Sequence, residues 1–325
     1  MRGWWRDFTD LVLPPECGGC GRPRTVLCGR CRTALSGAPP VRVRPDPEPP
    51  GLPVVHAAAP YADEVRATLL AHKERGALAL ARPLGEALAG AVRAGLEAWA
   101  EAADADQWRV PGAHTAGDER GWLLDARTVG RAQEVPARRA ASRRRAGGGG
   151  PLLVPVPSAR GAVRARGHDA GRRIAFAAAG VLRRGGVAAR VVPVLRQRRV
   201  VADQAGLGAQ ERLANLAGAL AVAPGGERLL LTGGSVVLVD DLMTTGASLA
   251  EAARVVRAAL SGARLDGGRI SSVSAPAFVY RGERWERRGE QQRNRPVRET
   301  VSRRADRVCA AVVGAPPDAF EINRN

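Results

Sequence analysis

The stretch VVLVDDLMTTGAS, residues Val236 to Ser248, has the clearest structural pattern in this chain of 325 residues. Its first four residues are all apolar, without the polar alternation of a half-exposed strand. They therefore predict a strand that is covered on both faces, as the strands of parallel sheets are. Two acids, Asp240 and Asp241, follow at the carboxyl end of this strand, which is the edge where parallel sheets bind ligands.

Small and hydroxyl-bearing residues come next, and we expect them to form a phosphate-binding turn. These residues are Thr244, Thr245, Gly246, Ala247 and Ser248. Their backbone amides, together with the first turn of a following helix, suit a phosphate group. A purely structural alternative is helix capping, because Ser248 and Glu251 match a capping box. Capping leaves the two adjacent carboxylates unexplained, since burying them without a partner is costly, and we therefore expect the stretch to bind a ligand.

The segments around this stretch alternate between apolar strands and helices. Strands are predicted at 54–61, 151–157, 189–195 and 234–241, and helices at 62–100 (two, broken near Gly76), 170–183, from about 209 onwards, and 248–260. Such an alternation is typical of βαβ units, so the predicted fold class is α/β, with a parallel sheet flanked by helices. Two segments, 270–279 and 308–314, compete for the last strand.

The cysteines predict a metal site near the start of the chain. Cys17 and Cys20 form one C-x2-C knuckle, and Cys28 and Cys31 form a second one after seven further residues. Four thiolates close a tetrahedral zinc site that leaves no ligand position open, so we expect a small structural zinc ribbon. An iron site with the same ligands and a pair of disulfides are the alternatives. Cys309 stands alone in an apolar segment and is most simply a small core residue.

Changes in composition along the chain predict its domain organisation. The predicted segments are a zinc-ribbon region at 1–35, a Pro-rich and poorly packed linker at 36–53, the first strand and helices at 54–100, a disordered basic and glycine-rich insertion at 101–150, the sheet core at 151–279, a charged insertion at 280–307, and a C-terminal strand and tail at 308–325.

The charge balance favours anionic partners. The formal net charge is +18, and Lys73 is the only lysine among the 50 lysine and arginine residues. Such an excess favours phosphate ligands, nucleic acid or an anionic membrane surface. No apolar run approaches the roughly 18 residues of a membrane span, and the first residues lack a signal-peptide pattern. We therefore expect a cytoplasmic protein that is not an integral membrane protein.

A second set of phosphate contacts is predicted in VPVPSARGAVRARGHDAG, which begins within the strand at 151–157. Arg160, Arg164 and Arg166 lie in this segment, and the planar guanidinium group matches phosphate oxygens. A solvated basic helix face is the alternative, since arginine is abundant throughout the chain.

The stretch at 236–248 resembles the phosphoribosyl-pyrophosphate (PRPP) motif of type I phosphoribosyltransferases. The resemblance implies that Asp240 and Asp241 hold the 2′- and 3′-hydroxyls of ribose. It also implies that residues 244–248 wrap the 5′-phosphate and that Mg2+ arrives with the pyrophosphate. Purine-salvage members of this family have an acidic general base where Thr244 stands here, so a purine-salvage activity is not expected.

The order of the pieces is similar to the ComF family. The matching pieces are the cysteine pairs, YADEVRATLLAHKERG, the arginine-rich segment, DQAGLGAQERLANLAGAL and the PRPP motif. This resemblance implies a zinc ribbon joined to a type I phosphoribosyltransferase-like domain. It places Ser158, Ala159 and Arg160 in a pyrophosphate loop and Asp203 to Arg212 in a flexible hood. Family members often have Arg-Gly-Phe-Asn-Gln where this chain has RGHDA, from Arg166 onwards, and His168 is expected to be structural.

Three functions follow from these resemblances and from the charge. In the first, we expect the chain to transfer phosphoribosyl from PRPP to an unknown acceptor with release of pyrophosphate, and no catalytic base is assigned. Alternatively, it handles single-stranded DNA together with DNA-uptake proteins during competence, as the ComF resemblance implies. A third alternative is a protein that binds PRPP without turnover.

Overall fold

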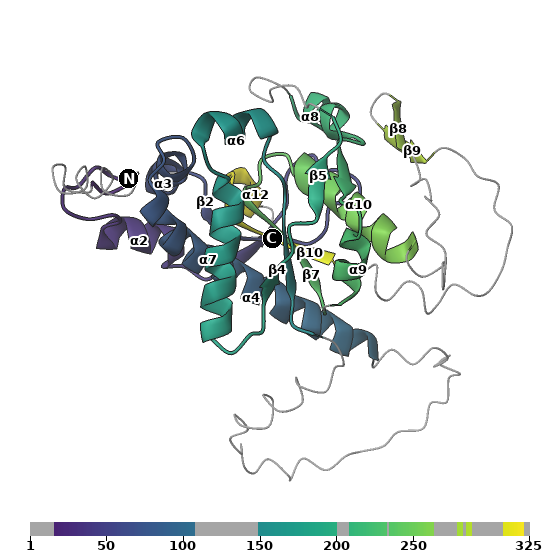
Figure 1. Cartoon of the computed structure of the whole chain (residues 1–325), viewed down its shortest axis with the longest axis horizontal. Helices are drawn as coiled ribbons and strands as arrows, with labels where there is room; N and C mark the ends of the chain where they lie inside the picture. Colours follow the sequence, from purple (N-terminus) through teal and green to yellow (C-terminus); the bar gives the residue numbers. More distant parts are fainter. Residues whose placement is uncertain are drawn as a thin grey trace, which may run out of the picture.

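The computed structural model describes residues 16–107, 149–199, 208–232, 234–262, 278–281, 284–287 and 308–321. They form a mixed α/β fold around a six-stranded sheet with the order β1-β2-β10-β7-β3-β4 (Figure 1). The strands of this sheet are β1 (Val41–Val43), β2 (Val55–Pro60), β3 (Leu152–Pro155), β4 (Arg190–Val191), β7 (Val236–Leu242) and β10 (Val308–Ala315). Within the described sheet only β1 runs antiparallel to its neighbour, so the predicted α/β class with a mostly parallel sheet is confirmed.

Helices cover both faces of this sheet, which explains the unbroken apolar runs of its central strands. Neighbouring residues of β3 point into different cores, Leu152 into one and Leu153 into the other. The core around Leu152 includes α10 (Ala247–Gly262), and the core around Leu153 includes α4 (Ala81–Gln107) and α7 (Ala170–Arg184). Figure 1 shows α4 and α7 on one side of the strands and α10 on the other. A strand between two cores needs apolar side chains at every position.

Shorter elements surround this framework. The helices are α2 (Gly29–Ser36), α3 (Asp63–Lys73), the 3-10 helix η1 (Leu78–Leu80), α6 (Arg160–Arg166), α8 (Ala209–Leu216), α9 (Gly226–Leu231) and α12 (Asp318–Glu321). Two further sheets have two strands each, β5 (Leu195–Gln197) with β6 (Leu220–Val222), and β8 (Phe278–Arg281) with β9 (Arg284–Arg287). The helix break predicted near Gly76 lies between α3 and α4, where this residue has a positive φ of 67° that favours glycine.

The last strand of the sheet is β10, which settles the choice between the two C-terminal segments. It pairs in parallel with both β2 and β7, and all of its residues are buried. Of the competing segment 270–279, only the last two residues are described, in β8, which pairs with β9. A strand between β2 and β7 is covered on both faces, which requires the wholly apolar sequence found in β10.

The Pro-rich segment 36–53 is packed, contrary to the prediction of a poorly packed linker. It contributes β1, and Pro45 and Pro49 are buried. A Cβ at Gly246 would lie 3.1 Å from Leu52 Cδ1 and 3.3 Å from Pro45 Cγ. This segment therefore covers the turn after β7 instead of separating two domains.

The predicted insertions lie mostly outside the described residues. Helix α4 continues to Gln107, so the start of the insertion predicted at 101–150 is helical. Residues 108–148 lie outside the described part of the chain, as does most of 280–307 apart from β8 and β9. Among the described residues, no helix is long and apolar enough to cross a membrane.

Candidate functional site

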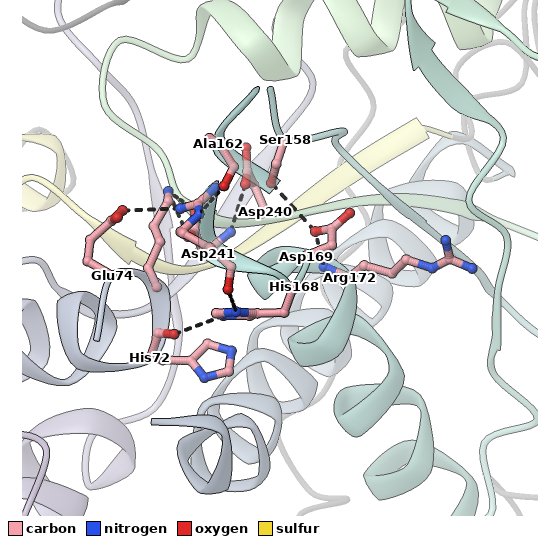
Figure 2. Close-up of polar contacts among 11 residues, drawn as sticks. His72, Glu74, Ser158, Ala162, His168, Asp169, Arg172, Asp240 and Asp241 are labelled. Atoms are coloured by element: carbon pink, nitrogen blue, oxygen red, sulfur yellow. Dashed lines mark hydrogen bonds and ion pairs between the residues drawn. The ribbon is translucent and has the colours of Figure 1, made fainter. Parts of the chain in front are cut away.

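Two acids stand at the end of β7, between the ends of β10 and β3. Asp241 is 6% exposed, and Asp240 is partly buried. The backbone N–H of Asp241 donates to Asp240 Oδ1 at 2.8 Å (Figure 2). Burial and the adjacent Asp241 raise the pKa of the Asp240 carboxyl well above its usual range, and Lys73 opposes this shift. Two enclosed carboxylates of this kind need a cation or hydroxyl donors beside them.

The cation beside the acids is Lys73, at the end of α3. Its Nζ lies 2.9 Å from Oδ2 and 3.2 Å from Oδ1 of Asp241. Burial lowers the pKa of Lys73, but attraction to Asp241 and Asp240 outweighs burial, so that this pKa is raised overall. Lys73 was not predicted as a site residue, although being the only lysine of the chain was a signal that could have marked it.

The two neighbours of Lys73 reach the segment that follows β3. Glu74 Oε1 lies 3.1 Å from Arg166 Nη1, and the carbonyl oxygen of His72 lies 3.2 Å from His168 Nε2 (Figure 2). Three consecutive residues at the end of α3 therefore contact three different parts of the site, which are β7, α6 and the turn between α6 and α7.

The three arginines predicted to bind phosphate lie in different environments. The side chain of Arg166 is 10% exposed and is paired with Glu74, and its Nε donates to the carbonyl oxygen of Ala162 at 3.0 Å. Arg160 and Arg164 are exposed on α6, a helix with no buried residue. An anion can therefore reach Arg160 and Arg164 directly, whereas Arg166 would share its charge with Glu74.

The turn between β3 and α6 contains the other two residues assigned to a pyrophosphate loop, Ser158 and Ala159. Ser158 Oγ donates to Asp169 Oδ1 at 3.5 Å (Figure 2). The same oxygen of Asp169 accepts the backbone N–H of Arg172 at 3.1 Å and thereby caps α7. The side chain of Asp169 therefore joins the turn after β3 to the start of α7.

The turn after β7 leads directly into α10, which begins at Ala247. Gly246 has a φ of 74°, a conformation that favours glycine. Ser248 lies within the first turn of α10 and is therefore not its N-cap. Glu251 pairs with Arg254 at 2.7 Å instead of completing a capping box. The capping alternative therefore does not describe this turn.

Arg212, on α8, reaches the same turn from the segment predicted as a hood. Its Nη1 lies 3.3 Å from Thr244 Oγ1, and its Nε is buried without a hydrogen-bond partner among the described residues. An unpaired buried N–H group is costly, and a bound anion would satisfy it. The predicted hood at 203–212 is described only from Gly208 onwards.

A cavity of about 190 Å³ adjoins the turn, with Thr244 and Thr245 in its wall. Asp46 and Asp318 also line this cavity. Their carboxylates disfavour an anion in the cavity itself, so an anion at this turn is expected at the backbone amides instead.

The four cysteines predicted as metal ligands, Cys17, Cys20, Cys28 and Cys31, lie together. Their Sγ atoms are all within 4.8 Å of one another, and those of Cys20 and Cys28 are 3.6 Å apart. Sulfurs bound about 2.3 Å from a tetrahedral zinc ion stand roughly 3.8 Å apart, so these four thiols can hold a metal ion such as zinc. Burial raises the pKa of Cys17, but backbone N–H groups, above all that of Cys28, outweigh burial and lower it to about 6.

The cysteine cluster packs against α3, the helix that carries Lys73. Arg30 Nε donates to Glu64 Oε1 at 2.9 Å. A Cβ at Gly19 would lie only 3.1 Å from Thr68 Oγ1, so the knuckle approaches the helix closely. One helix therefore supports both the cysteine cluster and the acids of β7.

Cys309, the fifth cysteine, lies apart from this cluster in β10 and is 5% exposed. Burial raises its pKa to about 12, which keeps it in the thiol form. This environment agrees with the prediction of a small core residue.

Protein-family models give no match to this chain, and a search of curated proteins finds no matching sequence.

Proposed function

We propose that this chain is a phosphoribosyltransferase-like protein that binds PRPP and transfers its phosphoribosyl group to an acceptor, with release of pyrophosphate. The observation that carries the proposal is the position of Asp240 and Asp241 at the carboxyl end of a central parallel strand, followed by a small-residue turn and a helix. This arrangement provides carboxylates for sugar hydroxyls and backbone amides for a phosphate within one stretch. The resemblance of 236–248 to the PRPP motif adds support.

Each part of the site has a role in this proposal. The two carboxylates accept hydrogen bonds from the ribose hydroxyls, and the turn at 244–248 binds the 5′-phosphate. The turn after β3, with the exposed Arg160 and Arg164, faces the pyrophosphate, which Mg2+ accompanies because that ion prefers phosphate and carboxylate oxygens. Positioning and electrostatic stabilisation then provide the catalysis, with no dedicated base.

A calorimetric titration of PRPP, with and without Mg2+, tests the proposal. The double variant Asp240→Asn, Asp241→Asn keeps the side-chain size and should bind PRPP at least about 100-fold more weakly, because hydrogen bonds to two charged groups are lost. Glu101→Gln removes an exposed carboxylate on α4, outside the residues assigned to the site, and should alter the affinity by no more than about threefold. Absence of Mg2+-dependent binding to the folded wild-type protein would overturn the proposal.

Measured release of pyrophosphate distinguishes an enzyme from a protein that binds PRPP without turnover. Tight PRPP binding without release in the presence of candidate nucleophiles would assign the non-catalytic alternative.

Binding of single-stranded DNA is a second candidate function, which the outer face of α7 favours. Phe176 is 47% exposed, and the guanidinium carbon of Arg172 lies 5.6 Å from its ring centroid. Arg173 is also exposed. An exposed ring beside arginines can stack on a base. Salt-dependent binding of an oligonucleotide that Phe176→Ala weakens would support this function, and binding that the variant leaves unchanged would exclude this surface.

A further inference from the structure

The ion pair of Lys73 occupies one of the two carboxylates to which the proposed function assigns a sugar hydroxyl. The ammonium group bridges both oxygens of Asp241, at 2.9 and 3.2 Å. The side chain of Asp241 is only 8% exposed, whereas that of Lys73 is 35% exposed. The pair is therefore enclosed on the side of the acid and open to solvent along the lysine. A sugar hydroxyl that hydrogen-bonds to Asp241 would therefore compete with this ammonium group for the carboxylate oxygens.

The choice of lysine at this position is informative. All but one of the 50 lysine and arginine residues are arginine. A guanidinium group would lock onto Asp241 through two parallel hydrogen bonds, whereas an ammonium group on a flexible stem changes partners easily. A lysine at position 73 therefore provides a cation that holds Asp241 and can also leave it.

A second cation lies near Lys73. Arg166 is close enough to counteract the rise in the pKa of Lys73, and it is held by Glu74, the next residue along the chain. Two cations thus lie close together, each paired with its own carboxylate. An anion with several oxygens that enters between them would attract both.

We propose that Lys73 is a displaceable counter-ion that moves from Asp241 to the diphosphate group of the ligand when the ligand binds. The inference rests on the proposed PRPP function and adds a residue and an exchange to it. The ribose hydroxyls take over the oxygens of Asp241, and the diphosphate oxygens take over the ammonium group. Every charged group therefore keeps a partner and no proton is gained or lost. Lys73 is the last residue of α3, and its flexible four-carbon stem lets the ammonium group change position without a change in the helix backbone.

The test compares two ligands in Lys73→Met, which removes the charge and keeps the length of the side chain. The variant should bind PRPP with Mg2+ roughly 10- to 100-fold more weakly. It should bind ribose 5-phosphate, which has no diphosphate group, within about threefold of the wild type. Arg66→Met removes an exposed charge two turns earlier on the same helix and is the matched control, with no change expected for either ligand.

The outcomes separate the inference from the function on which it rests. Equal weakening of both ligands would mean that Lys73 only holds Asp241 in place, and no weakening would mean that it plays no part; either result overturns the inference alone. If wild-type protein with Mg2+ does not bind PRPP at all, the proposed function is overturned together with it.

A measurement on the wild-type protein does not depend on the folding of a variant. Because Lys73 is the only lysine, its acetylation rate can be followed by mass spectrometry without interference from other lysines. We expect PRPP with Mg2+ to slow this acetylation several-fold, and ribose 5-phosphate to leave it unchanged or to raise it. An equal effect of the two ligands would contradict the exchange.

Discussion

The cysteine cluster and the pair of acids are both sets of like groups that crowd together, but they are neutralised in different ways. The four thiols lie within 4.8 Å of one another around a point where a metal ion can stand. Asp240 and Asp241 receive their cation from within the chain, through Lys73. A metal ion held by four thiolates fixes a local fold permanently, whereas a single lysine is a partner that a ligand can replace. The two regions therefore differ in the source of their counter-charge, which is a metal ion that the thiols can hold in one and a lysine of the chain itself in the other.

The first prediction concerns the cysteine cluster and has the largest expected effect. Cys31→Ser should abolish stoichiometric metal binding and expose the backbone of residues 17–36, because a structural zinc site contributes roughly 10 kcal/mol of folding free energy in small domains. Metal analysis and hydrogen exchange measured by mass spectrometry test this. Cys309→Ala, which changes the cysteine in β10, should keep the metal. An unchanged metal content in Cys31→Ser would mean that the cluster is not a metal site.

The sequence was sufficient for those parts of the molecule whose geometry is local. A C-x2-C spacing brings two thiols together within one turn, so the ligands could be predicted from the spacing alone. The buried strand β7 and its two acids were predictable for the same reason. An unbroken apolar run indicates a strand covered on both faces, and the acids and small residues that follow mark the end of that strand. Helix α7, predicted at 170–183, is observed as Ala170–Arg184.

The partners of the acids were not predictable, because they come from distant parts of the chain. Lys73 and Asp241 are 168 residues apart in sequence, and Glu74 and Arg166 are 92 residues apart. No periodicity connects such pairs, so Arg166 was assigned to phosphate without its carboxylate. The packing of 36–53 was not predictable for a related reason. A high proline content indicates a stiff backbone, but it does not indicate whether the segment packs against another part of the protein.

The second prediction distinguishes the two neighbouring acids by the sign of their effect on stability. Asp240→Asn should raise the free energy of unfolding by about 1–2 kcal/mol, because burial and Asp241 disfavour the ionised form of this side chain. The amide oxygen can still accept the N–H of Asp241. Asp241→Asn should lower the free energy of unfolding by about 1 kcal/mol, a modest value because Lys73 is one-third exposed and partly stabilised by water.

Urea denaturation at pH 7 without ligand measures both of these variants. Effects of the same sign would show that the two acids share one environment, against the assignment of Lys73 to Asp241 in particular.

The third and smallest prediction concerns pH and the buried histidine beside Lys73. Burial lowers the pKa of His72, an effect that carbonyl groups and Asp241 oppose only in part. Burial, together with Arg42, also lowers the pKa of His56 on β2. The unfolded chain binds a proton at each histidine below about pH 6.5, where the folded protein does not yet bind one, so acid favours unfolding. Each histidine should remove at most about 0.7 kcal/mol between pH 7 and pH 6.

Comparison of two variants assigns this pH dependence to the two histidines. The unfolding free energy of the wild-type protein should fall between pH 7 and pH 6. His72→Gln and His56→Gln should each make this fall smaller by the contribution of one histidine, whatever the stability of the variant at pH 7. The readout is the difference between the two pH values, measured by urea denaturation of metal-loaded protein so that the cysteines do not contribute. His72 lies on α3, between the cysteine cluster and the acids, whereas His56 lies on β2. If only His56→Gln reduces the pH dependence, then His72 is protonated to the same extent in the folded and unfolded states. The side chain of His72, at the end of α3, would then be exposed to water and not buried.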